Sequence, residues 1–195
     1  MDIIDLIQEE VKEKINEYKD NSKDHYDFWN EHIKYVYVES QKLAKKYGAD
    51  MEIVKLGALL HDIALICNVG DRKDHHINGK ILAEEILDKY DYPREKKDRV
   101  LSCIYNHRSS KNATNIEDLC VADADIIAHF DNIPMLFNSA YNRNNINLNK
   151  VRDWLKECFE KDYNDLSDKT KEDLDKNIMR YSVFARVKNY NEIFY

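Results

Sequence analysis

Apolar residues recur every three or four positions along most of this chain, which is the spacing of an amphipathic α-helix. The first such stretch is residues 2–20, whose apolar side is formed by Ile3, Ile4, Ile7, Val11, Ile15 and Tyr18. Polar breaks and glycines separate further helices, which we predict at about 25–47, 50–66, 75–90, 93–106 and 116–130. A last helical region is predicted at about 149–194, with Trp154, Leu155, Phe159, Leu166, Leu174, Ile178 and Tyr181 available for packing.

Prolines, glycines and apolar stripes predict how these helices begin and pack. Pro93 and Pro134 are each predicted to open a helix, because proline fits the first helical turn. Gly57 lies one turn before His61, where a missing side chain lets another helix approach closely. In the helix at 75–90, the residues predicted to face inward are Ile77, Ile81, Leu82, Ile86 and Leu87.

Composition agrees with a single all-α domain over residues 1–195. With only 4 glycines and 2 prolines, the chain holds little material for the turns of a β-sheet fold. The net charge of −7 disfavours long nucleic acid as a partner. We expect a cytoplasmic protein without a membrane segment, because no apolar run is long enough to span a bilayer and the N-terminus lacks a signal-peptide pattern. Reduced thiols are expected for Cys67, Cys103, Cys120 and Cys158, which form no C-x-x-C pair.

The pair His61-Asp62 interrupts the apolar segment at 53–66. Burying an imidazole and a carboxylate without partners would be unfavourable by several kcal/mol. A divalent cation would remove that penalty, because imidazole nitrogen and carboxylate oxygen are good ligands for Zn, Mn, Fe, Co or Ni. His32, in the second predicted helix, is a further candidate ligand that a helical bundle could bring to the same point.

The sixth predicted helix offers two carboxylates, Asp123 and Asp125. Side chains two positions apart on a helix point about 200° away from each other, so both cannot face one ion. From the residues alone either is a candidate ligand, and the other could hydrogen-bond a histidine ligand. Two imidazoles and two carboxylates would leave coordination positions open for water and substrate, as a catalytic metal needs.

In this order, His32, His61-Asp62 and Asp125 resemble the H…HD…D signature of the HD-domain superfamily of metal-dependent phosphohydrolases. The residues around the pair, Leu59 to Ile63, are similar to the apolar-apolar-His-Asp-Ile pattern of that superfamily. The resemblance covers about residues 25–140 and implies an all-α HD core there, with a C-terminal helical extension at about 141–195. It also implies one divalent metal, of open identity among Mn, Fe, Co, Ni, Zn and Mg, held by His32, His61, Asp62 and Asp125.

Two later histidines, His76 and His107, resemble the additional histidines of dinuclear HD proteins. The chain departs from the cyclic-dinucleotide branch of those proteins, because it lacks a lysine soon after His61-Asp62 and a glycine-rich signature after His107. Two readings stay open: His76 and His107 hold a second metal, or they contact substrate and transfer protons around one metal.

The remaining histidines are interpreted as structural residues. His75 is interpreted as a residue that caps or solvates a helix end. His25 and His129 are interpreted as surface or packing residues, although His129 follows Asp125 by one turn and could still approach the pocket.

The resemblance implies hydrolysis of a phosphate ester or anhydride by metal-activated water, which Asp62 or Asp125 would orient. The substrate class expected is a small phosphorylated compound, namely a nucleotide. Nearby cations that could bind its phosphate are Arg108, Lys80, Arg72 and Lys34. Arg108 is favoured among them because it adjoins His107 and its guanidinium can bind phosphate through two parallel hydrogen bonds.

Two other functions stay open at this point. One is a regulatory module that senses a nucleotide without turnover, and phosphate-ester turnover would separate it from an enzyme. The other is a di-iron oxygenase, as a minority of dinuclear HD proteins are, and oxygen consumption with iron would identify it. HD proteins are often homodimers, which the exposed helical faces of this chain permit.

Overall fold

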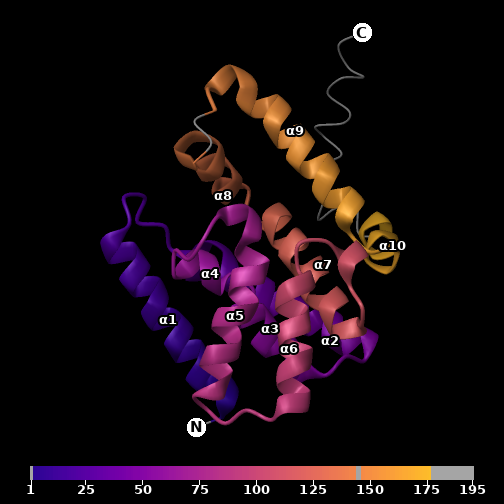
Figure 1. The fold of residues 1–195 in the computed structure, drawn as a ribbon. Coiled ribbons are helices and arrows are strands. Elements are labelled where there is room, and N and C mark those ends of the chain that lie inside the picture. The colour runs from indigo at the N-terminus through magenta and orange to yellow at the C-terminus, as the bar shows by residue number, and fades with distance from the viewer. Residues whose placement is uncertain (1, 144–145, 177–195) are drawn as a thin grey trace.

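The computed structural model describes residues 2–143 and 146–176, and these residues form helices and turns without a strand (Figure 1). The predicted all-α class is confirmed. The helices of the first half are α1 (Ile3–Asn21), α2 (Lys34–Tyr47), α3 (Met51–Leu60), α4 (Ile63–Ile66) and α5 (His75–Asp88). Those of the second half are α6 (Arg94–Asn106), α7 (Ile116–Asp131), α8 (Ile133–Asn138), α9 (Leu148–Asp165) and α10 (Asp168–Lys176). Within this part of the chain, no helix is both long and apolar enough to cross a membrane.

Helix α3 is the centre of the core. Its buried residues are Ile53, Val54, Leu56, Gly57, Ala58, Leu59 and Leu60. Apart from the partly exposed Glu52 and Lys55, this helix is apolar and must be surrounded by other elements; α3 packs against α1, α2, α6 and α7. Asp50 caps its N-terminus, because the Asp50 side chain accepts hydrogen bonds from the backbone N–H groups of Glu52 and Ile53. The C-terminal end of this core helix therefore lies in the middle of the molecule, and His61-Asp62 follows it there.

The helix predicted at 50–66 is interrupted at His61-Asp62, between α3 and α4. Asp62 leaves the helical conformation, with φ −104° and ψ 17°. On a continuous helix, adjacent side chains would point about 100° apart, whereas this turn lets both members of the pair face one site. A similar irregularity holds His32, which lies in a π-helical turn, η1 (Trp29–Ile33), immediately before α2.

The predicted helix starts at the two prolines are confirmed. Pro93 directly precedes α6, and Pro134 lies in the first turn of α8. The inward face predicted for α5 is wrong at two positions, because Ile77 is 42% exposed and Ile81 is 53% exposed. The buried face of α5 instead runs through Gly79 and Ala83, whose small side chains let α5 pack closely against α4 and α6.

The C-terminal helices lie over α7 (Figure 1). Phe159 of α9 and Leu166, which follows it, are buried in the same core as the helices described above. The Tyr47 hydroxyl at the end of α2 lies 3.0 Å from the Thr170 hydroxyl of α10. The predicted packing residues Ile178 and Tyr181 lie outside the described residues.

Replacing Gly57 with alanine is expected to lower the free energy of unfolding by about 1–3 kcal/mol. A Cβ atom at this position would lie 2.8 Å from Cys103 Cβ and 3.2 Å from Val121 Cγ2, so α6 and α7 would have to move away from α3. Gly79→Ala is the matched control, because its Cβ would meet no atom closer than 3.4 Å. Urea unfolding of both variants measures the difference, and equal stabilities would contradict the close approach at Gly57.

Candidate metal centre

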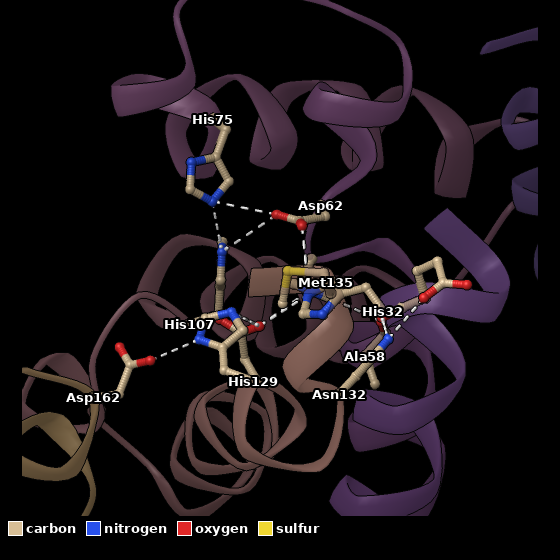
Figure 2. Close-up of polar contacts among 12 residues, drawn as sticks. His32, Ala58, Asp62, His75, His107, His129, Asn132, Met135 and Asp162 are labelled. Carbon is tan, nitrogen blue, oxygen red and sulfur yellow. Dashed lines mark hydrogen bonds and ion pairs between the residues drawn. The ribbon is translucent and has the colours of Figure 1, made fainter. Parts of the chain in front are cut away.

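His32, His61, Asp62 and Asp125 lie close together inside the bundle, and Figure 2 shows His32 and Asp62 among the residues of this region. The Nε2 atom of His32 lies 3.1 Å from His61 Nε2, 3.0 Å from Asp125 Oδ1 and 3.6 Å from Asp62 Oδ2. His61 Nε2 lies 3.7 Å from both carboxylates. Ligand atoms lie about 2.0–2.2 Å from a metal such as zinc, so two ligands of one ion are at most about 4.4 Å apart. These separations therefore suit one ion; we call these residues the first group.

The structure brings Asp125, rather than Asp123, to the first group. Asp123 is fully buried on another side of α7. Its carboxylate accepts hydrogen bonds from the hydroxyl groups of Ser110, Ser167 and Thr170 and from the Ser167 backbone N–H. Because the two aspartates point to different sides of α7, Asp125 belongs to the candidate metal centre and Asp123 anchors α10.

A second group forms on the other side of Asp62. The Oδ1 atom of Asp62 lies 3.3 Å from His75 Nε2 and 3.8 Å from His107 Nε2. These two imidazole nitrogens are 2.9 Å apart. Because Asp62 Oδ2 faces the first group and Asp62 Oδ1 faces the second, this carboxylate could bridge two ions, as in dinuclear sites with metals about 3.5–4 Å apart.

The histidine that joins His107 is His75, and not the predicted His76. His76 lies outside both groups, with its ring 5.5 Å from that of Tyr105 and 5.9 Å from that of His75. Adjacent residues on α5 point about 100° apart, so only one of the two can face Asp62. The interpretation of His75 as a helix-end residue was incomplete. Its Nδ1 atom does bond the Arg72 carbonyl in the turn before α5, and its Nε2 atom faces the site.

Spacing along α5 does not by itself select His75. His75 and His76 precede Gly79 by four and three positions, and both spacings place a residue on the buried face of Gly79 and Ala83. The choice of His75 comes from the packing of the turn before α5, where its Nδ1 atom bonds the Arg72 carbonyl.

Three of these histidines share one structural device. His61, His75 and His107 each directly follow the last residue of a helical segment, and each Nδ1 atom lies 2.6–2.8 Å from the backbone carbonyl three residues earlier. A carbonyl oxygen near a helix end has two lone pairs and can accept a hydrogen bond from a side chain there. A carbonyl can only accept, so Nδ1 must carry the proton and Nε2 is left with a lone pair. All three lone pairs point into the two groups.

This arrangement of donors fits a metal ion. The Nε2 lone pairs of His75 and His107 face each other at 2.9 Å, and with both protons on Nδ1 nothing but a cation would make that approach favourable. Metal-bound histidines characteristically donate their other nitrogen to a carbonyl or carboxylate, as these three do.

The charges also suit a cation. Burial lowers the pKa of His107 to about 4, with a further contribution from His61, and burial likewise lowers the pKa of His32. Burial acts to raise the pKa of Asp62 and of Asp125, but the surrounding histidines hold both below the usual range of a carboxyl group. Neutral imidazoles and ionised carboxylates are the protonation states that bind metal. No lysine or arginine in the described ranges pairs with either carboxylate.

His129 extends the first group toward the C-terminal helices. Its Nε2 atom lies 3.9 Å from Asp125 Oδ1, and its Nδ1 atom lies 3.0 Å from Asp162 Oδ2 of α9. Burial acts to lower the pKa of His129, but the hydrogen bond to Asp162 and the charge of Asp125 raise it to about 9. The interpretation of His129 as a packing residue missed this contact, although its spacing from Asp125 had left it open.

The predicted phosphate-binding cations lie outside both groups. Arg108 is exposed and donates from Nη1 to the Lys73 carbonyl at 2.8 Å. Lys80 is exposed and lies 5.6 Å from the centre of the Tyr105 ring. Arg72 is exposed on the turn before α5, while Lys34 donates to Asn30 Oδ1 at 3.2 Å. Among them, Arg108 and Lys80 lie on the side of the second group, around His76 and Tyr105.

If His75 rather than His76 belongs to the second group, the two alanine variants should differ in metal content. We expect His75→Ala to lose one of about two metal ions per chain, because it removes one of the three candidate ligands of the second group, which are Asp62, His75 and His107. His76→Ala, its matched control one position away, should keep both. Metal analysis of the two proteins after dialysis against Mn²⁺ checks this, and the reverse pattern would return the role to His76.

Comparisons with known proteins agree with the geometry. A family model described as HD domain matches residues 30–129, which is just over half of the chain. A ribonuclease Y from Treponema denticola is 33% identical over 98 residues, which make up 50% of this chain and 18% of that protein. The chain thus spans less than a fifth of the length of that relative. A crystal structure of an HD-superfamily hydrolase from Bacillus thuringiensis is 19% identical and has a TM-score of 0.60, covering 95% of this chain and 98% of that one, a likeness of fold.

Proposed function

Because the chain belongs to the HD-domain family, we propose that it is a metal-dependent phosphohydrolase acting on a small phosphorylated substrate, namely a nucleotide. The observation that carries this proposal is the position of Asp62, whose two oxygens face separate sets of histidine lone pairs. This arrangement supports two divalent ions sharing one carboxylate. Divalent ions bound there would supply an activated water and positive charge for the phosphoryl oxygens.

The role that we propose for each residue at the site follows from its position. His61, His75 and His107 hold fixed tautomers through their Nδ1 hydrogen bonds, so no reorganisation is needed for their Nε2 atoms to act as ligands. Asp125 supplies the remaining carboxylate of the first group, and Asp62 links the groups. Because these side chains come from turns and helices of the packed core, the constellation is preorganised.

The side of the second group is the better candidate for substrate entry. Arg108, Lys80 and the ring of Tyr105 are exposed there, and His76 lies among them. A phosphate approaching the second group would meet these cations, and the Tyr105 ring offers an apolar surface to a base. The net charge of −7 supports a small substrate over long nucleic acid.

The test is hydrolysis by the full chain loaded with Mn²⁺, Co²⁺, Ni²⁺, Zn²⁺, Fe²⁺ or Mg²⁺. Substrates should include nucleoside monophosphates, nucleoside triphosphates, a cyclic dinucleotide and a single-stranded RNA oligonucleotide, the last because of the similarity to a ribonuclease Y. Metal-dependent release of phosphate from a nucleotide supports the proposal. Bound metal without hydrolysis of any substrate would overturn it and favour a sensing module, while oxygen consumption by the iron form would favour an oxygenase. Light scattering on the same sample checks the expected homodimer.

Arg108→Ala is expected to raise KM for a nucleotide substrate roughly tenfold while leaving metal content unchanged, because a charged hydrogen bond to phosphate contributes about 1.5 kcal/mol. Arg108 also bonds the Lys73 carbonyl in the turn that precedes His75, so Arg108→Lys, which keeps the positive charge, is the control variant. Steady-state kinetics and metal analysis are both needed. Metal loss in Arg108→Ala would assign this residue a structural role.

A further inference from the structure

We propose that His129 is a further ligand at the first group and that Asp162 of α9 positions it. The inference rests on the proposed function only in taking that group to hold a metal ion. It goes further because Asp162 lies 33 residues after His129, beyond the segment matched by the HD family model. The C-terminal helices would then help to build the metal centre.

The position of His129 on α7 gives it access to the ion. Asp125 and His129 are four residues apart on one helix, so their side chains lie on the same face one turn apart. This is the spacing by which two ligands on one helix bind a common metal in other proteins. The His129 ring stacks on the His32 ring, with centroids 5.7 Å apart and an interplanar angle of 23°.

Ligand atoms of His32, Asp125 and His129 all lie within 4.8 Å of one another. The separation of 3.9 Å between His129 Nε2 and Asp125 Oδ1 is within the limit of about 4.4 Å for two ligands of one ion. His129 therefore needs little movement to coordinate a metal that Asp125 also binds.

Asp162 gives His129 the orientation that a ligand needs. The Asp162 side chain is largely buried, and its Oδ2 atom accepts a hydrogen bond of 3.0 Å from His129 Nδ1 (Figure 2). With Nδ1 bound to a carboxylate, Nε2 is the nitrogen that faces Asp125, and a metal ion bound there would displace the Nε2 proton. A carboxylate-histidine pair of this kind fixes the ring and strengthens the metal bond of the other nitrogen.

The backbone around this pair is held from two sides. Asp123, two residues before Asp125, binds Ser167 and Thr170 at the junction of α9 and α10. Asn132, three residues after His129, donates to the backbone carbonyl of Glu31 beside His32. These contacts tie α7 to α9, α10 and the π-helical turn, so the distance between His129 and the first group is fixed by the fold.

Binding of Co²⁺ followed by its visible absorption spectrum tests this inference without reference to activity. We expect His129→Ala to weaken Co²⁺ binding at one site by at least about tenfold and to change the d–d bands, because a nitrogen ligand is lost. Asp162→Asn should shift the same bands while leaving the side-chain volume and the packing of α9 intact. Glu160→Gln, at an exposed position of α9, is the matched control and should behave as wild type.

The outcomes separate this inference from the proposed function. Unchanged Co²⁺ affinity and spectra in folded His129→Ala and Asp162→Asn would overturn the inference while leaving the hydrolase proposal intact. Altered spectra in both variants would support it even if wild type hydrolysed no phosphate ester. If His129→Ala failed to fold, as circular dichroism would show, the isosteric Asp162→Asn decides, since a merely structural role for Asp162 would leave its Co²⁺ spectrum unchanged.

Discussion

Asp62→Ala is expected to abolish metal binding at both groups and metal-dependent hydrolysis with it. Asp62 supplies one carboxylate oxygen to His32 and His61 and the other to His75 and His107, so one substitution removes a ligand from each side. Losing a residue that merely supports a ligand weakens metal affinity by about 10–100-fold, and loss of a shared ligand should exceed that. Metal content by elemental analysis should fall from about two ions per chain to a small fraction of one.

Asp71→Ala is the control for this substitution, because Asp71 is an exposed acid on the loop between α4 and α5. It should keep both ions and full activity. His61→Ala is expected to resemble Asp62→Ala in the loss of hydrolysis while keeping more metal, since it removes a ligand from the first group alone. An Asp62→Ala protein that kept wild-type metal content would contradict the proposed centre.

Asp123→Ala is expected to lower the free energy of unfolding by about 2–4 kcal/mol, since buried hydroxyl groups would lose their acceptor. The side chains affected are Ser110, Ser167 and Thr170, of which Ser110 and Thr170 are buried. For a chain of this size, such a loss corresponds to a melting temperature lower by roughly 5–15 °C. Differential scanning calorimetry measures the change.

Two variants define what Asp123 contributes. Asp123→Asn keeps one acceptor oxygen and should lose less stability than the alanine variant. Asp168→Ala, at an exposed position in the first turn of α10, is the control for a general effect on that helix and should change stability by less than about 0.5 kcal/mol. If Asp123→Ala lost metal at an unchanged melting temperature, the assignment of Asp125 as the ligand would be overturned.

The H…HD…D residues could be predicted because their types are unusual for their surroundings. His61 and Asp62 stand in an apolar helix that the core must bury, and a buried polar pair requires partners. In the structure both residues lie within 4 Å of His32, and His61 also lies within 4 Å of Asp125. Their roles as ligands stay predictions until metal is measured.

The second group was harder to predict, because it depends on which face of α5 is buried. Large apolar residues suggested a face containing Ile77 and Ile81, yet close packing against α4 and α6 selects the face of Gly79 and Ala83. Where two helices lie very close, only a small residue fits between them. The hydrophobic pattern of the sequence does not show where such close contacts occur. His76 was preferred to His75 for a different reason, its resemblance to the additional histidines of dinuclear HD proteins, and that resemblance does not contain the turn that brings His75 to Asp62.

By itself, the sequence determined the helical class, most helix boundaries and the identity of the His-Asp pair, because periodicity, caps and buried polarity are local properties of the chain. Only the tertiary structure decided which carboxylate of Asp123 and Asp125 meets the histidines, and that Asp62 faces two groups at once. It also decided that Asp162 reaches His129 across 33 residues of chain. The physical reason is that these contacts depend on how helices rotate and break when they pack together, which is set by the three-dimensional fit of their side chains.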